Sequence, residues 1–220
     1  MNSDPTSADL LGSARRRLLR RALAPAFYRA QGWVHLLRWR LRGRPLPAPS
    51  AFKQLVVKSY VRRFAVRTVV ETGTYLGAMV MALRQQRLHV YSIELSRTLA
   101  ERAIDLFAGD ARVSILHGDS AAVLPDLLPH LESPCLFWLD AHYSGGVTAA
   151  GSKQTPIMEE LAHVLRPGVS GDVVLIDDAR CFTPDFGYPT VETVRAFVAG
   201  RWPGAVFDVE DDIIRIHRPR

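Results

Sequence analysis

The sequence predicts an α/β protein with a doubly wound, mostly parallel seven-stranded sheet that ends in an antiparallel hairpin. From about residue 67 onward, short apolar runs alternate with helical segments, which is typical of a parallel sheet covered by helices on both faces. The runs 136–139 and 173–176 are continuously apolar, as expected of strands buried on both sides. The last two runs are separated only by Glu210-Asp211-Asp212, a connection too short for a parallel crossover.

The elements follow in order along the chain. Strands are expected at the short apolar runs, over residues 67–72, 89–94, 113–117, 135–140, 172–177, 205–209 and 213–217. Helices are expected between them and before the first strand, over residues 50–64, 76–86, 97–107, 120–130, 155–165 and 191–198. Ser50 is the expected N-cap of the first of these helices. Pro125 is expected to interrupt the helix over 120–130.

The first 50 residues differ from the rest of the chain in charge. They hold ten Arg and two Asp, a net charge of +8, whereas residues 51–220 hold 18 basic and 20 acidic side chains, a net charge of −2. We therefore divide the chain into an Arg-rich N-terminal helical extension with a Pro-rich linker (residues 1–50) and an α/β domain (residues 51–220). A near-neutral domain argues against a protein whose main work is to bind nucleic acid.

The N-terminal extension permits three interpretations. Its arginines are interleaved with the aromatic residues Phe27, Tyr28, Trp33 and Trp39. Residues 13–44 could make peripheral contact with an anionic membrane or contact nucleic-acid phosphates. They could instead pack on the domain or on a partner subunit, as in a homodimer.

The composition favours a cytoplasmic protein, with peripheral membrane contact left open. The two cysteines, Cys135 and Cys181, do not make a disulfide framework. The first 45 residues contain no uninterrupted apolar stretch of the kind found in secretory signals. No run approaches the ~20 apolar residues that span a bilayer.

The loop after the first predicted strand is the best candidate for a cofactor site. It reads Glu-Thr-Gly-Thr-Tyr-Leu-Gly over residues 71–77. Gly73 allows a tight turn and close approach of a ligand, and Gly77 allows the next helix to pack near the strand. The second strand ends in Glu94, which can accept hydrogen bonds from both ribose hydroxyls of an adenosine ligand.

The type of adenosine ligand follows from what the loop lacks. A dinucleotide fingerprint requires Gly-x-Gly-x-x-Gly, and Tyr75 stands where the second glycine would let a pyrophosphate approach. Glu71 would repel a pyrophosphate but favours an ammonium or sulfonium group. A cationic, phosphate-free adenosine cofactor therefore fits better than a nicotinamide dinucleotide, although a nicotinamide-dependent oxidoreductase stays open as the alternative.

The same residues resemble a known family. Residues 71–77 are similar to motif I of the class I S-adenosylmethionine-dependent methyltransferases, in the variant of the catechol-type small-molecule O-methyltransferases, and residues 91–94 and 113–120 resemble their second and third strand ends. The resemblance covers residues 55–217. It implies S-adenosylmethionine as cofactor, bound by Glu71, Gly73, Thr74, Tyr75, Gly77, Glu94, Asp119, Ser120 and Asp140.

Acidic residues follow the fourth and fifth strands. Asp140 ends one strand, and Asp177 and Asp178 end the next. Because these strand ends lie side by side, three carboxylates converge and repel one another unless a positive group joins them. A hard divalent cation such as Mg²⁺ would do so, and the catechol-type family has a similar Asp…Asp-Asn set. Alternatively, these residues cap turns or pair with the adjacent Arg180.

The catalytic base departs from the family pattern. The family usually has a Lys three residues after the first Asp, and Tyr143 stands at that position here. His142 is the candidate base, because its pKa lies near neutrality, and Asp140 is the second candidate catalytic residue; His142 could instead contact substrate. The leading hypothesis is methyl transfer to a hydroxyl of a small molecule, such as a sugar or secondary metabolite. A non-catalytic membrane or partner adaptor is the other alternative.

Overall fold

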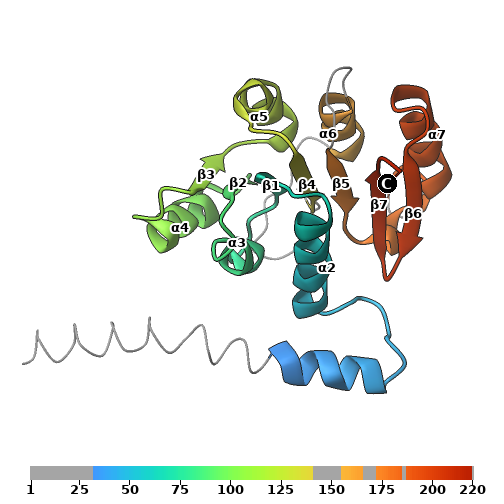
Figure 1. The fold of residues 1–220 in the computed structure, drawn as a ribbon, viewed down its shortest axis with the longest axis horizontal. Helices are drawn as coiled ribbons and strands as arrows, with labels where there is room; N and C mark the ends of the chain where they lie inside the picture. The colour runs from blue at the N-terminus through green and yellow to red at the C-terminus, as the bar shows by residue number, and fades with distance from the viewer. Residues whose placement is uncertain (1–31, 141–154, 166–171, 185–186, 220) are drawn as a thin grey trace, which may run out of the picture.

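The computed structural model describes residues 32–140, 155–165, 172–184 and 187–219, and it contains the predicted seven-stranded sheet (Figure 1). The strand order is β3-β2-β1-β4-β5-β7-β6. The strands are β1 (Thr68–Thr72), β2 (His89–Glu94), β3 (Val113–His117), β4 (Cys135–Leu139), β5 (Val173–Ile176), β6 (Val206–Glu210) and β7 (Ile213–His217). Each lies within a residue of its predicted bounds, so the fold class is confirmed.

The strand directions place the site. Strands β1 to β5 pair in parallel, whereas β7 is antiparallel to both β5 and β6. Val70 of β1 lies between Tyr91 of β2 and Phe137 of β4. The chain moves outward from β1 to β3 and then returns to β4, so the strand order reverses between β1 and β4. In open α/β sheets, ligands bind at the carboxyl edge beside such a reversal.

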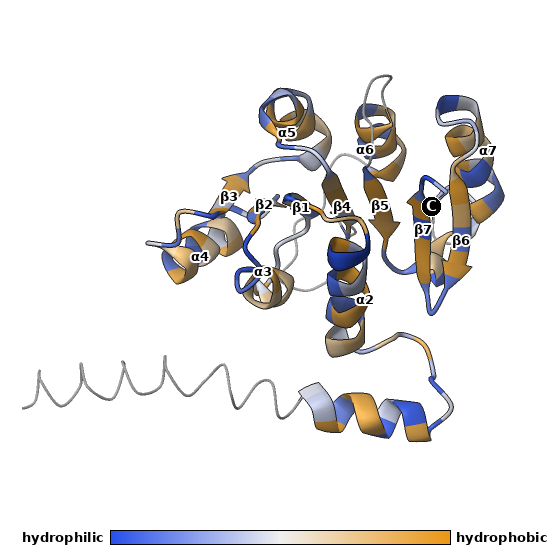
Figure 2. Cartoon of the chain, in the orientation of Figure 1, coloured by the Kyte–Doolittle hydropathy of each residue, from blue (hydrophilic) through white to orange (hydrophobic). Residues whose placement is uncertain are grey.

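Helices cover both faces of the sheet (Figure 1). One face packs under α5 (Ser120–Leu127), α6 (Ile157–Val164) and α7 (Val191–Arg201). The other packs under α2 (Ser50–Arg63), α3 (Ala78–Leu83) and α4 (Arg97–Phe107). Successive side chains of a strand point to opposite faces of the sheet. Phe137 therefore packs in the core under α5, α6 and α7, and Trp138 packs in the core under α2, α3 and α4. Figure 2 shows β4 and β5 as almost uniformly hydrophobic, and every residue of both strands is buried, as expected of strands covered on both faces.

Two local expectations need correction. Ser50 is the first residue of α2, and Pro49 takes the N-cap position without a side-chain hydrogen bond. The Pro49 backbone is extended and its carbonyl accepts hydrogen bonds from the N–H groups of Phe52 and Lys53, which starts the helix. Helix α5 runs through Pro125 to Leu127 and ends in the 3-10 turn η1 (Leu128–His130), so the proline does not interrupt it.

The described part of the N-terminal extension packs on the domain. Residues 32–41 are helical, and Leu36, Trp39 and Ala48 form a small buried cluster against Phe52 and Leu55 of α2. The Trp39 ring lies 4.7 Å from that of Phe52, and its Nε1 donates a hydrogen bond of 2.7 Å to the carbonyl of Pro45. Within the described part of the chain, no helix has the length and hydropathy needed to cross a membrane.

Candidate active site

The loop between β1 and α3 turns through left-handed backbone conformations at the carboxyl edge. Gly73 has φ 88° and Gly77 φ 75°, so both glycines are required by the turn. Tyr75, at the position of the missing second glycine, also has a positive φ of 48°. Its N–H donates a hydrogen bond of 2.8 Å to Oε2 of Glu94, which compensates part of the cost of that conformation.

Glu94 joins two loops of the edge. Besides the bond from Tyr75, its Oε1 accepts a hydrogen bond of 2.9 Å from the N–H of Ser96. The carboxylate is buried at the end of β2, yet each oxygen keeps a second lone pair. Glu94 can therefore accept further hydrogen bonds from hydroxyl groups without releasing the loops.

Glu71 lies beneath the loop and not on its surface. Only 3% of it is exposed, and Ser92 Oγ donates a hydrogen bond of 2.5 Å to its Oε2. Thr74 Oγ1 lies 2.7 Å from the same Ser92 oxygen. Burial raises the pKa of Glu71 to about 8, and the charges of Asp140 and Glu94 add to the shift. The Glu71 carboxyl is therefore protonated at neutral pH, and a cationic ligand nearby would favour its ionised form.

The predicted adenine-side residues begin α5. Asp119 is the N-cap, and its side chain accepts a hydrogen bond of 3.0 Å from the N–H of Ala121. Ser120 is buried beside Glu160 of α6. Asp119 therefore has a structural role, whether or not it also contacts a ligand.

Glu160 is a site residue that sequence reasoning missed. It is 1% exposed, and burial raises its pKa to about 7, although hydrogen bonds with Ser120 and Thr72 work against the shift. Its Oε1 has no hydrogen-bond partner among the residues that the structure describes. The signal was in the sequence: Ile157, Glu160, Leu161 and Val164 form the buried face of α6, and Glu160 is its one acid.

The three predicted carboxylates do converge. Asp140 follows β4, where its N–H donates to the carbonyl of Thr72 at 3.1 Å, and the N–H of Asp177 donates to the carbonyl of Leu139 at 3.0 Å. One oxygen from each of Asp140, Asp177 and Asp178 lies within 4.8 Å of the others. Asp178 has a left-handed backbone with φ 55°. Asp is among the non-glycine residues that adopt this conformation most readily, and here it turns the chain at the end of β5.

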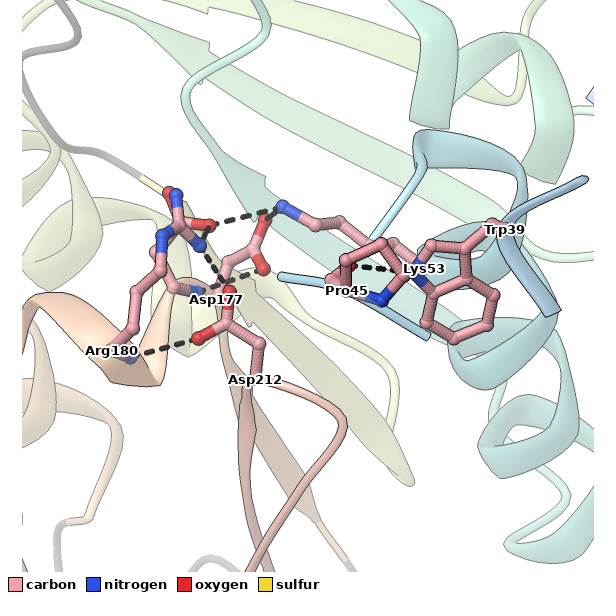
Figure 3. A network of polar contacts seen from close by, with 7 residues as sticks. Trp39, Pro45, Lys53, Asp177, Arg180 and Asp212 are labelled. Carbon is pink, nitrogen blue, oxygen red and sulfur yellow. Dashed lines mark hydrogen bonds and ion pairs between the residues drawn. The ribbon is translucent and has the colours of Figure 1, made fainter. Parts of the chain in front are cut away.

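A lysine that sequence reasoning missed lies against this cluster (Figure 3). Nζ of Lys53 is 2.5 Å from Oδ2 of Asp177 and 3.1 Å from Oδ1 of Asp178. Burial lowers the pKa of Lys53, but the charges of Asp177, Asp178 and Asp140 outweigh it and raise the pKa above its usual value. Lys53 is therefore an ammonium ion. The chain has 25 Arg and only three Lys, so a lysine in this helix was itself a signal.

Arg180 supplies a second positive charge. Its Nη1 lies 2.7 Å from Oδ1 of Asp178 and also pairs with the buried Asp212 in the β6–β7 turn (Figure 3). The predicted alternative, a pair between an acid and the adjacent Arg180, is therefore confirmed for Asp178. Burial and the charges of Asp140 and Asp178 raise the pKa of Asp177, whereas the charge and hydrogen bond of Lys53 oppose this shift.

The cluster suits a hard divalent cation by its chemistry. Its donors are carboxylate oxygens, and they lie close together. Lys53 already contacts two of the three carboxylates. An ion would therefore share those oxygens with the ammonium or displace it.

A pocket opens beside the cluster. It encloses about 250 Å³ including the open solvent at its mouth. Its lining combines carboxylates and apolar walls: Leu139, Asp140, Thr155, Ile157, Glu160, Ile176, Asp177, Asp178, Phe182 and Tyr188. The rings of Phe182 and Tyr188 meet edge to face at 5.3 Å and form one wall. The predicted base His142, with Tyr143, lies outside the described residues.

Comparison with known proteins identifies the fold. No protein-family model matches the chain, and no curated protein matches its sequence. A methyltransferase of Podospora anserina bound to S-adenosylhomocysteine matches over 100% of both chains with 15% identity and a TM-score of 0.54. An O-methyltransferase of Bacillus cereus in complex with S-adenosylhomocysteine matches over 86% of this chain and 91% of its own, with 18% identity and a TM-score of 0.53.

A third solved structure agrees with these two. The O-methyltransferase TomG of Streptomyces achromogenes, which is involved in tomaymycin synthesis and was crystallised with S-adenosylmethionine, matches over 86% of this chain and 89% of its own. The identity is 21% and the TM-score 0.51. The chain therefore has the class I methyltransferase fold, as the resemblance of residues 71–77 predicted.

Proposed function

We propose that the protein transfers a methyl group from S-adenosylmethionine to a hydroxyl of a small molecule. The observation that carries the proposal is the set of acidic side chains at the carboxyl edge between β1 and β4. Three acids lie together there, namely Glu71, Glu94 and Asp140. In the loop above them, Tyr75 stands where a dinucleotide-binding loop would have a glycine. This edge favours a cationic adenosine ligand and disfavours the pyrophosphate of a nicotinamide dinucleotide. Solved structures of the same fold hold S-adenosylmethionine or its product.

The cofactor's parts follow the loops. Gly73, Thr74 and Gly77 shape the turn against which the methionine end would lie, and Glu71 is buried beneath it, where a cationic ligand would favour its ionised form. Glu94 accepts the ribose hydroxyls, and the start of α5 at Asp119 and Ser120 lies towards the adenine. A cofactor held in this way would have its sulfonium methyl near the pocket beside Asp140.

Methyl transfer at that point is a single displacement. The acceptor oxygen forms a bond to the methyl carbon, the carbon–sulfur bond breaks, and sulfur keeps the electron pair. The hydroxyl proton passes to a carboxylate of the pocket, for which Asp140 is the described candidate. The ammonium of Lys53 stabilises the negative charge that develops on the acceptor oxygen. A divalent cation held by Asp140, Asp177 and Asp178 would polarise the same hydroxyl.

The lining limits the class of acceptor. Four carboxylates (Asp140, Glu160, Asp177 and Asp178) face a pocket that also has apolar walls. Such a lining suits a polyhydroxylated or cationic molecule with an apolar side, and it repels phosphate and carboxylate groups. Glu160 is protonated over part of the neutral range, since its pKa is raised to about 7, so it can either donate or accept a hydrogen bond to the acceptor.

Calorimetric titration tests the proposal. The purified protein is titrated with S-adenosylhomocysteine and with NAD, each with and without Mg²⁺, and the titrations are repeated with Glu94→Gln. We expect S-adenosylhomocysteine to bind, Glu94→Gln to weaken it, and NAD not to bind. Binding of NAD alone would establish the oxidoreductase alternative. Binding of neither ligand by the folded protein would overturn the cofactor assignment and favour an adaptor.

A further inference from the structure

The helix over residues 32–41 has two apolar rows. Leu36 and Trp39 are buried against α2. Trp33, Leu37 and Leu41 form a second row at four-residue spacing and are 61%, 60% and 79% exposed. Because each residue turns the helix by about 100°, the two rows lie about 130° apart around its axis. The second row, the apolar stripe (Trp33, Leu37 and Leu41), therefore points away from α2, and Figure 2 shows hydrophobic and hydrophilic turns side by side on this helix.

The surroundings of the apolar stripe are strongly basic. Residues 10–70 contain 13 Arg and two Lys and no Asp or Glu. Arg38, Arg40, Arg42 and Arg44 are exposed, and by helical position Arg38 and Arg40 lie on opposite flanks of the stripe. Within the described part of the chain, one of these four arginines has an ion pair: Arg44 lies 3.6 Å from Asp211.

Nucleic acid, a second copy of the chain and an anionic bilayer differ in how well they match the two features. Nucleic-acid phosphates would meet the arginines but leave three large apolar side chains in water. A second copy of the chain would cover the stripe but bring the same positive charge against it. An anionic bilayer offers acyl chains to the stripe and headgroup charge to its flanks. Arginine side chains can extend their stems along the apolar boundary while the guanidinium groups stay at the headgroups.

We infer that the helix over residues 32–41 docks in the plane of an anionic lipid surface, with the apolar stripe inserted among the lipids. The rest of the molecule is held to it by the packing of Trp39 on Phe52. None of the stripe residues lines the pocket, so the inference stands independently of the proposed function.

Cosedimentation of the full chain with lipid vesicles tests the inference. We expect binding to an equal mixture of phosphatidylcholine and phosphatidylglycerol, weakening as salt is added, and little binding to phosphatidylcholine alone. Replacing the stripe by Trp33→Ser, Leu37→Ser and Leu41→Ser should reduce binding at least about tenfold. Replacing Arg38, Arg40 and Arg42 by Gln should reduce it about fivefold per arginine.

A matched control separates the stripe from general surface hydrophobicity. Ile104 and Leu106 of α4 are 46% and 44% exposed, so Ile104→Ser with Leu106→Ser removes exposed apolar groups elsewhere and should leave vesicle binding unchanged. Circular dichroism shows whether each variant is folded. Absence of binding to the anionic mixture, or equal loss in the control, would overturn the inference. So would a dimer in sedimentation velocity that the stripe variant dissociates.

Discussion

Nζ of Lys53 lies 2.5 Å from Oδ2 of Asp177, a carboxylate 124 residues later in the chain. This contact brings α2, which precedes the first strand, into the cluster at the ends of β4 and β5. The acid cluster is therefore completed by a side chain from outside the strand-end loops that the sequence singles out. It also places an ammonium ion against Asp177 and Asp178, two carboxylates that line the pocket.

Lys53→Met should remove most of the methyl transfer while leaving S-adenosylhomocysteine binding nearly unchanged, because Lys53 contacts the acid cluster and not the cofactor loop. Loss of the pair should also lower the free energy of unfolding by about 1–3 kcal/mol. Lys58→Met, on the same helix, is the matched control and should retain activity. Rates with a transferable methyl label and thermal melts measure the two effects. Full activity in Lys53→Met would remove Lys53 from the reaction.

The same contact predicts competition with a divalent ion. Since Lys53 contacts Asp177 and Asp178, removing it takes one positive charge away from the cluster, although Arg180 still contacts Asp178. Mn²⁺, which reports on magnesium-type sites by its paramagnetic resonance, should therefore bind Lys53→Met more tightly than the wild type. Asp140→Asn should weaken Mn²⁺ binding in both backgrounds. An unchanged affinity in Lys53→Met would show that the ion, if it binds, uses other oxygens.

The acid cluster could be predicted from the sequence, but its contact with Lys53 could not. The strands and the convergence of Asp140, Asp177 and Asp178 could be predicted, because continuous apolar runs specify buried strands and parallel strands end at one edge. The contact between Lys53 and Asp177 could not be predicted. Periodicity places a residue on one face of a helix, but it does not say which residue 124 positions later that face will contact.

Glu160 was missed for a different reason. An acid among the apolar positions of a short helix indicates a buried carboxylate. Glu160 lies on a helix, whereas the candidate carboxylates were sought at the ends of strands. Ser50 was assigned as an N-cap from its residue type, whereas the extended Pro49 before it fixes the start of α2. Residue type predicts a cap only where the backbone leaves the position open.

Glu71 predicts a pH dependence of stability. The unfolded carboxyl loses its proton near 4.5, whereas the folded one keeps it up to about 8. Between these values the folded state holds one more proton, so stability falls as pH rises, by up to about 1.4 kcal/mol per pH unit from this group. Denaturant unfolding of Glu71→Gln should show a shallower decline between pH 5 and pH 8 than the wild type. Identical slopes would contradict the raised pKa.

The same carboxyl should report cofactor binding. A cationic ligand above Glu71 lowers its pKa, so binding of S-adenosylmethionine near pH 7 should release protons. Titrations in two buffers with different protonation enthalpies measure this release. We expect it to be smaller in Glu71→Gln, and equal release in both proteins would place the cation elsewhere.

Gly77 is required for the loop by two separable effects. It has φ 75°, and an added Cβ would lie 2.8 Å from Cε2 of Phe107. Gly109 has a similar φ of 87° but nothing within 4 Å of an added Cβ. Gly109→Ala should therefore cost only the backbone strain, about 1 kcal/mol, whereas Gly77→Ala should cost clearly more. Chemical denaturation of both variants measures the difference, and equal losses would show that Phe107 yields freely.

Glu160 should influence both the stability of the protein and its choice of acceptor. Glu160→Gln keeps the size and a carbonyl oxygen but removes the charge that burial penalises. Above pH 7, where the wild-type carboxyl is ionised, the variant should therefore be more stable than the wild type. The same change removes one of the four carboxylates that line the pocket. With polyhydroxylated or cationic acceptors, kcat/KM should fall, and rejection of carboxylate-bearing analogues should weaken. Glu159→Gln, one residue earlier on α6 and absent from the pocket lining, is the matched control. A gain in stability without any change in acceptor preference would make Glu160 a structural residue only.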